Sequence, residues 1–162
     1  MRSSGIYIFL YGSEMRGLPG ERILGSLEHS RQPASADGTL YAPSASFPVA
    51  VFGDGSGNAV KGELVQVQES RMAAALTALS QANGYLGKGN TGNTVELVEI
   101  DAHPFGGEEV IGHVWAFAAP KHFTPDAADA IEGGDWRAYR ESLSGQQGIT
   151  PAASSLAQAS AG

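Results

Sequence analysis

The chain has 162 residues, no cysteine, 42% hydrophobic residues and a formal net charge of −7. This length is typical of one domain, and the hydrophobic fraction is enough for a sizeable core. The lack of cysteine excludes disulfides and a thiolate zinc site, and the acidic balance argues against nucleic-acid and membrane surfaces, which both require clustered basic residues.

The first element predicted along the chain is a buried strand over residues 6–11, which are apolar on both faces and rich in β-branched and aromatic types. This run is too short for a signal sequence or a membrane span, so we expect a cytoplasmic protein. A glycine-bounded loop over 12–20 follows, and Pro19 is well placed to open a helix through 21–27. Residues 30–59 are polar and contain Pro and Gly, which favours short strands and turns.

The middle of the chain alternates more regularly. A strand is predicted over 60–67, and a helix over 71–82 with Ser70 as its N-cap and Gly84 at its C-terminus. The glycine-rich stretch 85–93 has no periodicity, and we interpret it as a loop.

Two further strands, 94–101 and 109–118, form a predicted hairpin, and a short helix over 135–143 ends the regular structure. Residues 1–143 are then one domain and 144–162 a flexible tail. Strands outnumber helices, which indicates an α+β fold with a small curved or barrel-like mixed sheet and two or three flanking helices.

Common catalytic motifs are absent from the sequence. The histidines, His29, His103, His113 and His122, are not at metal-ligand spacing, so no metal site is expected, and there is no Gly-x-Ser-x-Gly motif. The glycines of 87–92 match a dinucleotide pattern, but they follow a helix and precede a strand, which is the wrong context for that fingerprint.

The loop after the first strand is the best candidate for a site. Gly12 allows backbone N–H groups to turn toward a small anion or a carbonyl oxygen, and the predicted helix N-terminus nearby favours negative charge. The alternative is an ordinary turn between a strand and a helix.

This loop also carries a family resemblance. Tyr11-Gly12-Ser13-Glu14-Met15-Arg16-Gly17 resembles the Tyr-Gly-Ser/Thr-Leu-Met-Arg-Gly opening of gamma-glutamylcyclotransferase-like (AIG2-like) proteins. Further segments that resemble this family follow in the right order, at 62–67, 79–85, 98–100 with 114–117, and 131–137. The resemblance spans about residues 6–143 and implies the gamma-glutamylcyclotransferase-like fold.

The resemblance implies a mechanism without metal or cofactor. The α-amine of a small-molecule substrate attacks the substrate's own γ-glutamyl carbonyl and releases 5-oxoproline and an amine. A glutamate acts as general base and acid, and backbone N–H groups of the Tyr-Gly-Ser loop hold the substrate.

This chain departs from the family pattern at the catalytic position. Asn83 stands where the family has its glutamate, and an amide cannot take a proton from an amine at neutral pH. The Asp of the same motif is Ser80 here, and Asn93 and Val95 stand where a Tyr-x-Arg usually precedes the hairpin.

A second resemblance draws attention to Glu14. Residues 12–19 match the Gly-Ala/Ser-His-x-x-Gly-x-Pro motif in the C-terminal domain of allophanate hydrolase, with Glu14 in the place of the histidine. That domain handles a small carboxylated, urea-like intermediate. An ionisable side chain inside a glycine loop is a candidate for a relocated acid or base. The alternative is that Glu14 points to water.

Glu14 is therefore the candidate catalytic residue. The candidate substrate-binding residues are Tyr11, Gly12, Ser13, Arg16 and Asn83, with Arg137 as a further partner for a carboxylate. Glu63, Glu96 and Glu99 are weaker candidates; alternation places Glu63 on the same face as Val65 and Val67, toward the interior.

Two classes of function remain open from the sequence. One is a cofactor-independent acid–base enzyme acting on a small γ-glutamyl-type or carboxylated amide. The other is a non-catalytic binding or assembly module of the same fold, or a protein like the allophanate hydrolase domain, with a partner enzyme or a second copy of itself. A deep cavity with Glu14 in its wall counts against the module.

Overall fold

The structure is a computed structural model that describes residues 5–45, 47–105 and 109–149. Its strands are β1 (Gly5–Leu10), β2 (Glu28–Ser44), β3 (Phe47–Phe52), β4 (Ala59–Gln68), β5 (Glu96–Pro104) and β6 (Ile111–Ala118). The helices are α1 (Met72–Asn83) and α2 (Trp136–Ile149), with 3-10 turns η1 (Glu21–Ile23), η2 (Gly25–Leu27), η3 (Glu69–Arg71), η4 (Ala127–Asp129) and η5 (Glu132–Gly134). None of the described helices is long and apolar enough to span a membrane.

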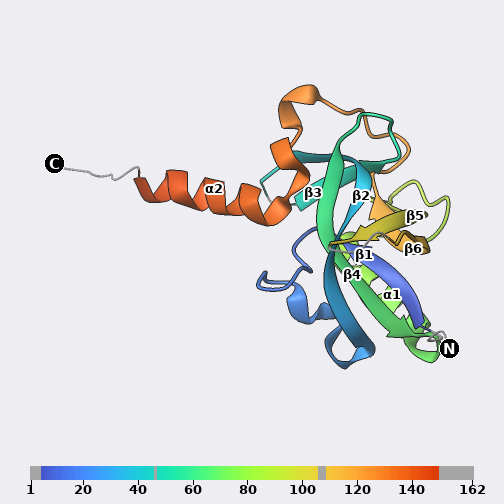
Figure 1. The fold of residues 1–162 in the computed structure, drawn as a ribbon. Coiled ribbons are helices and arrows are strands. Elements are labelled where there is room, and N and C mark those ends of the chain that lie inside the picture. The colour runs from blue at the N-terminus through green and yellow to red at the C-terminus, as the bar shows by residue number, and fades with distance from the viewer. Residues whose placement is uncertain (1–4, 46, 106–108, 150–162) are drawn as a thin grey trace.

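The strands form one mixed sheet that closes on itself (Figure 1). Its order is β3-β2-β4-β1-β6-β5, and β2 also pairs with β5. This second pairing joins β2, β4, β1, β6 and β5 into a five-stranded barrel, with β3 attached to β2. β1 runs parallel to β6, and the other paired strands run antiparallel. The predicted α+β fold with a small barrel-like sheet is confirmed.

β1 is buried on both faces, as the apolar run 6–11 predicts. Phe9 belongs to the cluster inside the barrel, and Tyr11 extends that face past the end of the strand. Ile8 and Leu10 belong to the second cluster, which lies between the sheet and α1. Burying an aromatic or aliphatic side chain of this size stabilises a fold by about 1.5–3 kcal/mol. The strand is thus fixed firmly, and the loop that follows starts from a rigid element.

The prediction of short strands and turns over 30–59 is confirmed from residue 47 on, where β3 has six residues, but it is wrong before that, because β2 is a single strand of 17 residues. Its first part pairs with β4 and its second part with β3. The strand places small residues, Ala34 and Ala36, inside the barrel, so no alternation of large apolar residues marks it in the sequence. At the change of partner, a Cβ on Gly38 would lie 2.4 Å from the Val51 carbonyl oxygen, so this position requires glycine.

The helix predicted over 21–27 is instead two separate 3-10 turns, η1 and η2. Gly25 has a φ of 54°, a left-handed value that a continuous α-helix does not allow. The predicted cap at Ser70 is also wrong: this residue lies within η3, and α1 follows from Met72 with no side-chain cap hydrogen bond. The predicted end of this helix is confirmed, because Gly84 adopts the left-handed conformation with a φ of 77°.

The two C-terminal predictions have different outcomes. The hairpin is confirmed by the antiparallel pairing of β5 with β6. The last helix continues to Ile149, beyond the expected end at 143, and it projects from the body of the molecule (Figure 1). The Asp135 carboxylate accepts a hydrogen bond from the Arg137 N–H at 3.0 Å, which explains the start of this helix. The predicted tail 144–162 therefore begins inside α2, and residues 150–162 lie outside the described residues.

Candidate functional site

The chain turns sharply where β1 ends. The Met15 N–H donates to the Gly12 carbonyl at 3.1 Å, and the Gly20 N–H donates to the Ser13 carbonyl at 2.8 Å. Gly12 leaves space in this turn: a Cβ there would lie 3.2 Å from Glu14 Oε1 and 3.2 Å from Pro48 Cγ. The glycine thus gives the Glu14 carboxylate room to lie against the backbone.

Glu14 is buried in this turn, with 8% of its surface exposed. Its Oε2 accepts a hydrogen bond of 2.8 Å from Nδ2 of Asn83, the last residue of α1. The alternative in which Glu14 points to water is therefore wrong. The structure brings together two of the candidate residues, Glu14 and Asn83, although 69 positions separate them in the sequence.

The contacts of the Asn83 amide define its orientation. Nδ2 also donates to the Leu79 carbonyl at 2.8 Å. Because the Glu14 carboxylate and the Leu79 carbonyl are both acceptors, the amide must present its nitrogen to them and not its oxygen. Oδ1 then accepts no hydrogen bond from any described residue. Thr94 fixes the helix end from outside, because its hydroxyl donates to the Asn83 carbonyl at 2.6 Å. Asn83 therefore offers a well-positioned acceptor on the side of its amide that Glu14 does not occupy.

A cavity of about 520 Å³ lies at this place. Its polar wall contains Tyr11, Gly12, Ser13, Glu14 and Asn83, which the sequence analysis selected. The remaining lining residues are Phe9, Leu10, Ile23, Phe47, Pro48, Gln81, Ala82, Gly84, Thr94, Val95 and Phe117. A site that combines a mostly apolar wall with a few polar groups is typical for a small-molecule ligand.

Tyr11 closes the inner side of the cavity. Its hydroxyl donates to the carbonyl oxygen of Phe117, at the end of β6. Burial raises the pKa of Tyr11 well above its ordinary value, and the nearby negative charge of Glu14 raises it further. The phenol is thus neutral over the physiological range and serves as a fixed wall of the cavity.

The loop also presents unused donors. The backbone N–H groups of Ser13 and Glu14 donate no hydrogen bond to any residue in the part of the chain that the structure describes. Adjacent backbone N–H groups of this kind can bind a carbonyl oxygen or an oxyanion. The residues that line this cavity therefore carry a carboxylate, an amide oxygen without a hydrogen bond from the described residues, and two free backbone N–H groups.

A buried ion cluster supports the loop from the other side. The Arg31 side chain is 2% exposed, and its Nη1 donates to Glu63 Oε1 at 2.8 Å and to the Glu14 carbonyl at 2.7 Å. Its Nη2 donates to Glu28 Oε1 at 2.6 Å. Desolvation alone would lower the pKa of Arg31, but the two carboxylates raise it above the ordinary value, so the guanidinium stays charged. This cluster positions the backbone of Glu14.

Two arginines that the sequence analysis proposed lie with this cluster and do not line the cavity. The Arg16 side chain is exposed, and the backbone N–H of Arg16 donates to Glu63 Oε1 at 2.8 Å. Arg137 Nη2 lies 3.4 Å from Glu63 Oε2 and also donates to the Arg16 carbonyl. The structure therefore does not bring Arg16 or Arg137 to the place where a ligand would bind.

Sequence reasoning missed Arg31. It stands in a polar stretch without periodicity, and its only local signal is Glu28, three positions before it. The weaker candidates lie elsewhere: Glu99 is exposed and lies 3.1 Å from His113 on the neighbouring strand, and Glu96 is half-buried on β5. None of Arg31, Glu96 and Glu99 lines the cavity.

A second cavity, of about 570 Å³, lies between β3 and β5. Its carboxylates, Asp37, Glu99 and Asp101, are exposed at its edge, and none is buried against a polar partner inside. Within the described residues, no group of three or more His, Cys, Asp or Glu side chains could hold a metal ion. The cavity with Glu14 has the stronger arrangement for chemistry.

Comparison with known proteins gives one family. The family model described as gamma-glutamyl cyclotransferase, AIG2-like, matches residues 8–138. No curated protein matches the chain.

Several solved structures share the fold. YkqA from Bacillus subtilis has a TM-score of 0.61 and 17% identity, over 88% of this chain and 43% of its own. An AIG2-like protein from Mus musculus has a TM-score of 0.55 and 17% identity, over 75% of this chain and 80% of its own. Allophanate hydrolase from Kluyveromyces lactis has a TM-score of 0.58 and 17% identity, over 86% of this chain and 21% of its own. At this level of identity, the likeness shows the fold.

Proposed function

Because the chain belongs to the gamma-glutamyl cyclotransferase, AIG2-like family, we propose that it is a cofactor-independent acid–base enzyme that cyclises a small γ-glutamyl-type amide. The observation that carries this proposal is the hydrogen bond between the Glu14 carboxylate and the Asn83 amide inside the cavity. Glu14 takes the role of the base that Asn83 cannot perform.

In the proposed reaction, the amine of the substrate lies against Glu14 Oε1. The amine nitrogen attacks the γ-carbonyl carbon, a new N–C bond forms, and Glu14 accepts the proton that the amine loses. The free N–H groups of Ser13 and Glu14 stabilise the oxyanion. Glu14 then returns the proton to the leaving nitrogen as the old C–N bond breaks, which releases a lactam and an amine.

Asn83 orients the base in this scheme. Its Nδ2 holds Glu14 Oε2 at 2.8 Å, which leaves Oε1 for the substrate. Its own Oδ1 is an acceptor for the second hydrogen of the substrate amine. Two acceptors at the amine would direct the nitrogen lone pair toward the carbonyl carbon, and correct orientation is a large part of catalysis in an intramolecular reaction.

A second candidate function has support from chain length. This chain spans 43% of YkqA and 21% of the K. lactis enzyme, so the fold also occurs inside longer chains. In this alternative the protein is an assembly module for a partner enzyme or for a second copy of itself.

For the first candidate, in which the protein is itself an enzyme, we propose small-molecule substrates and a cytoplasmic setting.

The test is to incubate the protein with γ-glutamyl amines, with free and with blocked α-carboxyl groups, and to detect the lactam by mass spectrometry. We expect product with the wild type and none above background with Glu14→Gln, a variant of the same shape that cannot accept a proton. Circular dichroism of both proteins provides the folding control. A Glu14→Gln variant as active as the wild type would overturn the assignment of the base, and a stable partner with no product from any amine would favour the module.

A further inference from the structure

The barrel has a free strand edge along β5. Among the described residues, β2 pairs with β5 at two positions only, Ala34 with Pro104 and Ser35 with His103. Residues 96–101 pair with β6 alone in the part of the chain that the structure describes. Since the backbone N–H and C=O groups of alternate residues point to the two sides of an antiparallel strand in turn, every second residue over 96–101 directs these groups away from β6.

The second cavity, of about 570 Å³, lies along this free edge. Four consecutive residues of β5, 98–101, line it, and so do four consecutive residues at the end of β3, 50–53. Successive side chains of a strand point to opposite faces of the sheet. A cavity that contacts every residue in such a run therefore faces the edge of each strand and not one face of the sheet.

A third cavity continues the second one along β5. It has a volume of about 900 Å³ and lies against residues 96–99, and both cavities are lined by Val98, Glu99, Ala119 and Lys121. Together they follow the stretch of β5 whose edge is free, and we call them the β5 groove. Neither cavity shares a lining residue with the cavity that contains Glu14.

The wall of the groove beside residues 98–101 is largely apolar. Its half-buried apolar side chains are Val51, Phe52, Val98, Ile100 and Phe123. Covering such side chains removes apolar surface from water, which favours association. A free strand edge next to apolar side chains is the arrangement in which an extended peptide adds a strand to a sheet.

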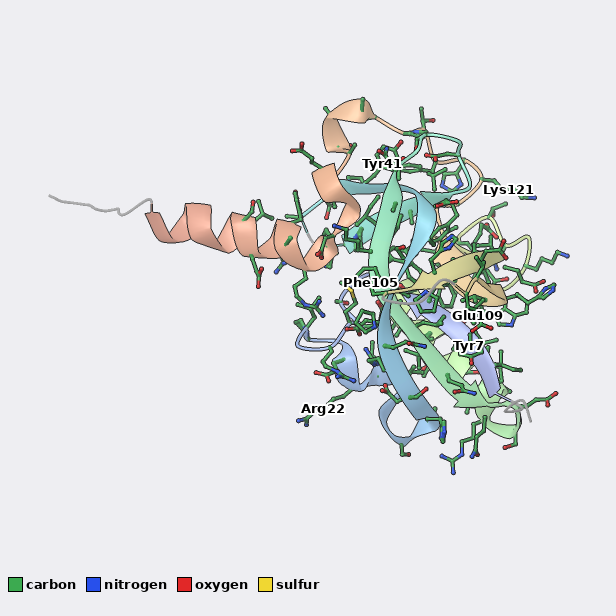
Figure 2. All side chains as sticks on the ribbon, viewed as in Figure 1. Tyr7, Arg22, Tyr41, Phe105, Glu109 and Lys121 are labelled. Atoms are coloured by element: carbon green, nitrogen blue, oxygen red, sulfur yellow. The ribbon has the colours of Figure 1, made fainter. Side chains whose placement is uncertain are left out.

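The charges at the rim of the second cavity are mostly negative. Its exposed carboxylates belong to Asp37, Glu99 and Asp101. Among the described residues that line this cavity, the one cation is Lys121, which projects outward (Figure 2). Glu99 lies 3.1 Å from His113 and Asp37 lies 4.0 Å from His103, whereas Asp101 has no ion-pair partner among the described residues. The rim therefore complements a basic ligand.

We propose that the β5 groove binds an extended segment of a partner protein in which basic residues alternate with apolar ones. The segment adds a strand beside residues 96–101, with its apolar side chains next to Val98 and Ile100 and its basic side chains next to Glu99 and Asp101. The partner is a different protein, because this chain has 10 Lys and Arg residues against 17 Asp and Glu residues and is not its own complement. This binding function is independent of the reaction proposed for Glu14.

The probe is a fluorescein-labelled peptide of sequence Lys-Val-Lys-Val-Lys-Val, whose binding is measured by fluorescence anisotropy. One control peptide, Glu-Val-Glu-Val-Glu-Val, reverses the charge. The other keeps the lysines and valines but carries a methyl group on every backbone nitrogen, so it cannot donate main-chain hydrogen bonds. We expect the first peptide to bind at least about tenfold more tightly than either control. A Kd above about 1 mM for the first peptide, or equal binding of the methylated one, would overturn the proposal.

A matched pair of variants locates the binding surface. Asp101 is exposed in the groove, and Glu141 is exposed on α2, which projects from the body of the molecule (Figure 1). Asp101→Lys and Glu141→Lys change the net charge by the same amount. We expect Asp101→Lys to weaken binding by about tenfold or more and Glu141→Lys by no more than about twofold. Equal weakening in both variants would show that the peptide responds only to net charge, which would overturn the proposal.

Hydrogen exchange of the wild type, followed by NMR, tests strand addition without any variant. We expect the peptide to slow exchange at alternate amides within residues 96–101. Exchange that is unchanged throughout β5 would overturn the proposal. So would equal binding of the dipeptide amide Lys-Val-NH2, which would identify a small-molecule site, or a dimer that the peptide dissociates in ultracentrifugation, which would assign the groove to a second copy of the chain.

Discussion

Glu14 and Glu63 are both nearly buried, with 8% and 7% of their surfaces exposed, yet their surroundings differ. Glu63 accepts hydrogen bonds from the Arg31 and Arg137 guanidinium groups and from the Arg16 N–H. Glu14 accepts one from the neutral Asn83 amide and otherwise faces a cavity. A buried carboxylate with matching cations is structural, whereas one left with a free oxygen beside an open cavity is available for chemistry.

We expect the largest effect on the unfolding free energy from a substitution at Glu63. Glu63→Leu removes the carboxylate that Arg31 and Arg137 share, and it leaves a buried guanidinium with only Glu28 as its anionic partner. Removing one partner of a buried ion pair costs about 3–5 kcal/mol of unfolding free energy. Urea unfolding measures this loss, and a loss below about 1 kcal/mol would show that the cluster is dispensable.

Glu14→Leu should have the opposite effect, with little change in the unfolding free energy and a loss of activity. The Asn83 amide loses a hydrogen bond, but a buried charge without a cation is also removed, so we expect the unfolding free energy to change by no more than about 1 kcal/mol. The same variant should form no lactam. Equal stability losses in Glu14→Leu and Glu63→Leu would contradict the distinction between the two carboxylates.

The sequence predicts Glu14 as a site residue better than it predicts the contacts of Glu14. The sequence singles out Glu14 as an ionisable residue in a glycine loop, and it singles out Asn83 as an amide where the resemblance leads us to expect a glutamate. Their hydrogen bond is not predictable, because it depends on how α1 docks against the barrel. The sequence does predict that they share a site, since both positions belong to motifs of one family.

Glu63 shows more clearly what the sequence does and does not predict. Alternation within its strand correctly predicts that it faces the interior, with Val65 and Val67. Its partner Arg31 could not be found, because strand pairing is non-local and β2 lacks the apolar alternation that would define its register. The difference between the two carboxylates therefore needed the structure.

A moderate effect is expected at Asn83. Asn83→Ala removes the donor that orients Glu14 and the acceptor offered to the substrate, whereas Asn83→Asp adds a second negative charge beside Glu14. A hydrogen bond to a charged group contributes about 1.5–3 kcal/mol, so we expect a roughly 10- to 100-fold lower kcat/KM for the alanine variant. The aspartate variant should raise the apparent pKa in the pH profile of kcat/KM. Wild-type kinetics in both variants would show that Asn83 plays no part in the site.

The smallest effect concerns pH and Tyr11. Because burial and Glu14 raise the pKa of Tyr11 above its ordinary value of 10.0, the unfolded chain ionises this phenol before the folded protein does. The stability contribution is complete below pH 10.0 and is lost as the pH rises above it. In thermal unfolding, the wild type should lose stability above that pH more steeply than Tyr11→Phe, while parallel curves would indicate that the phenol titrates normally.

In the proposed function, Glu14 acts as the base toward a substrate amine. A crystal structure of the protein with 2-aminobutanamide tests this role, because the amine of this compound and its amide group can be located separately. We expect the amine nitrogen within about 2.6–3.2 Å of Glu14 Oε1, with Asn83 Oδ1 as its second acceptor. An amine that points away from Glu14, or a ligand bound outside this cavity, would show that Glu14 is not the base.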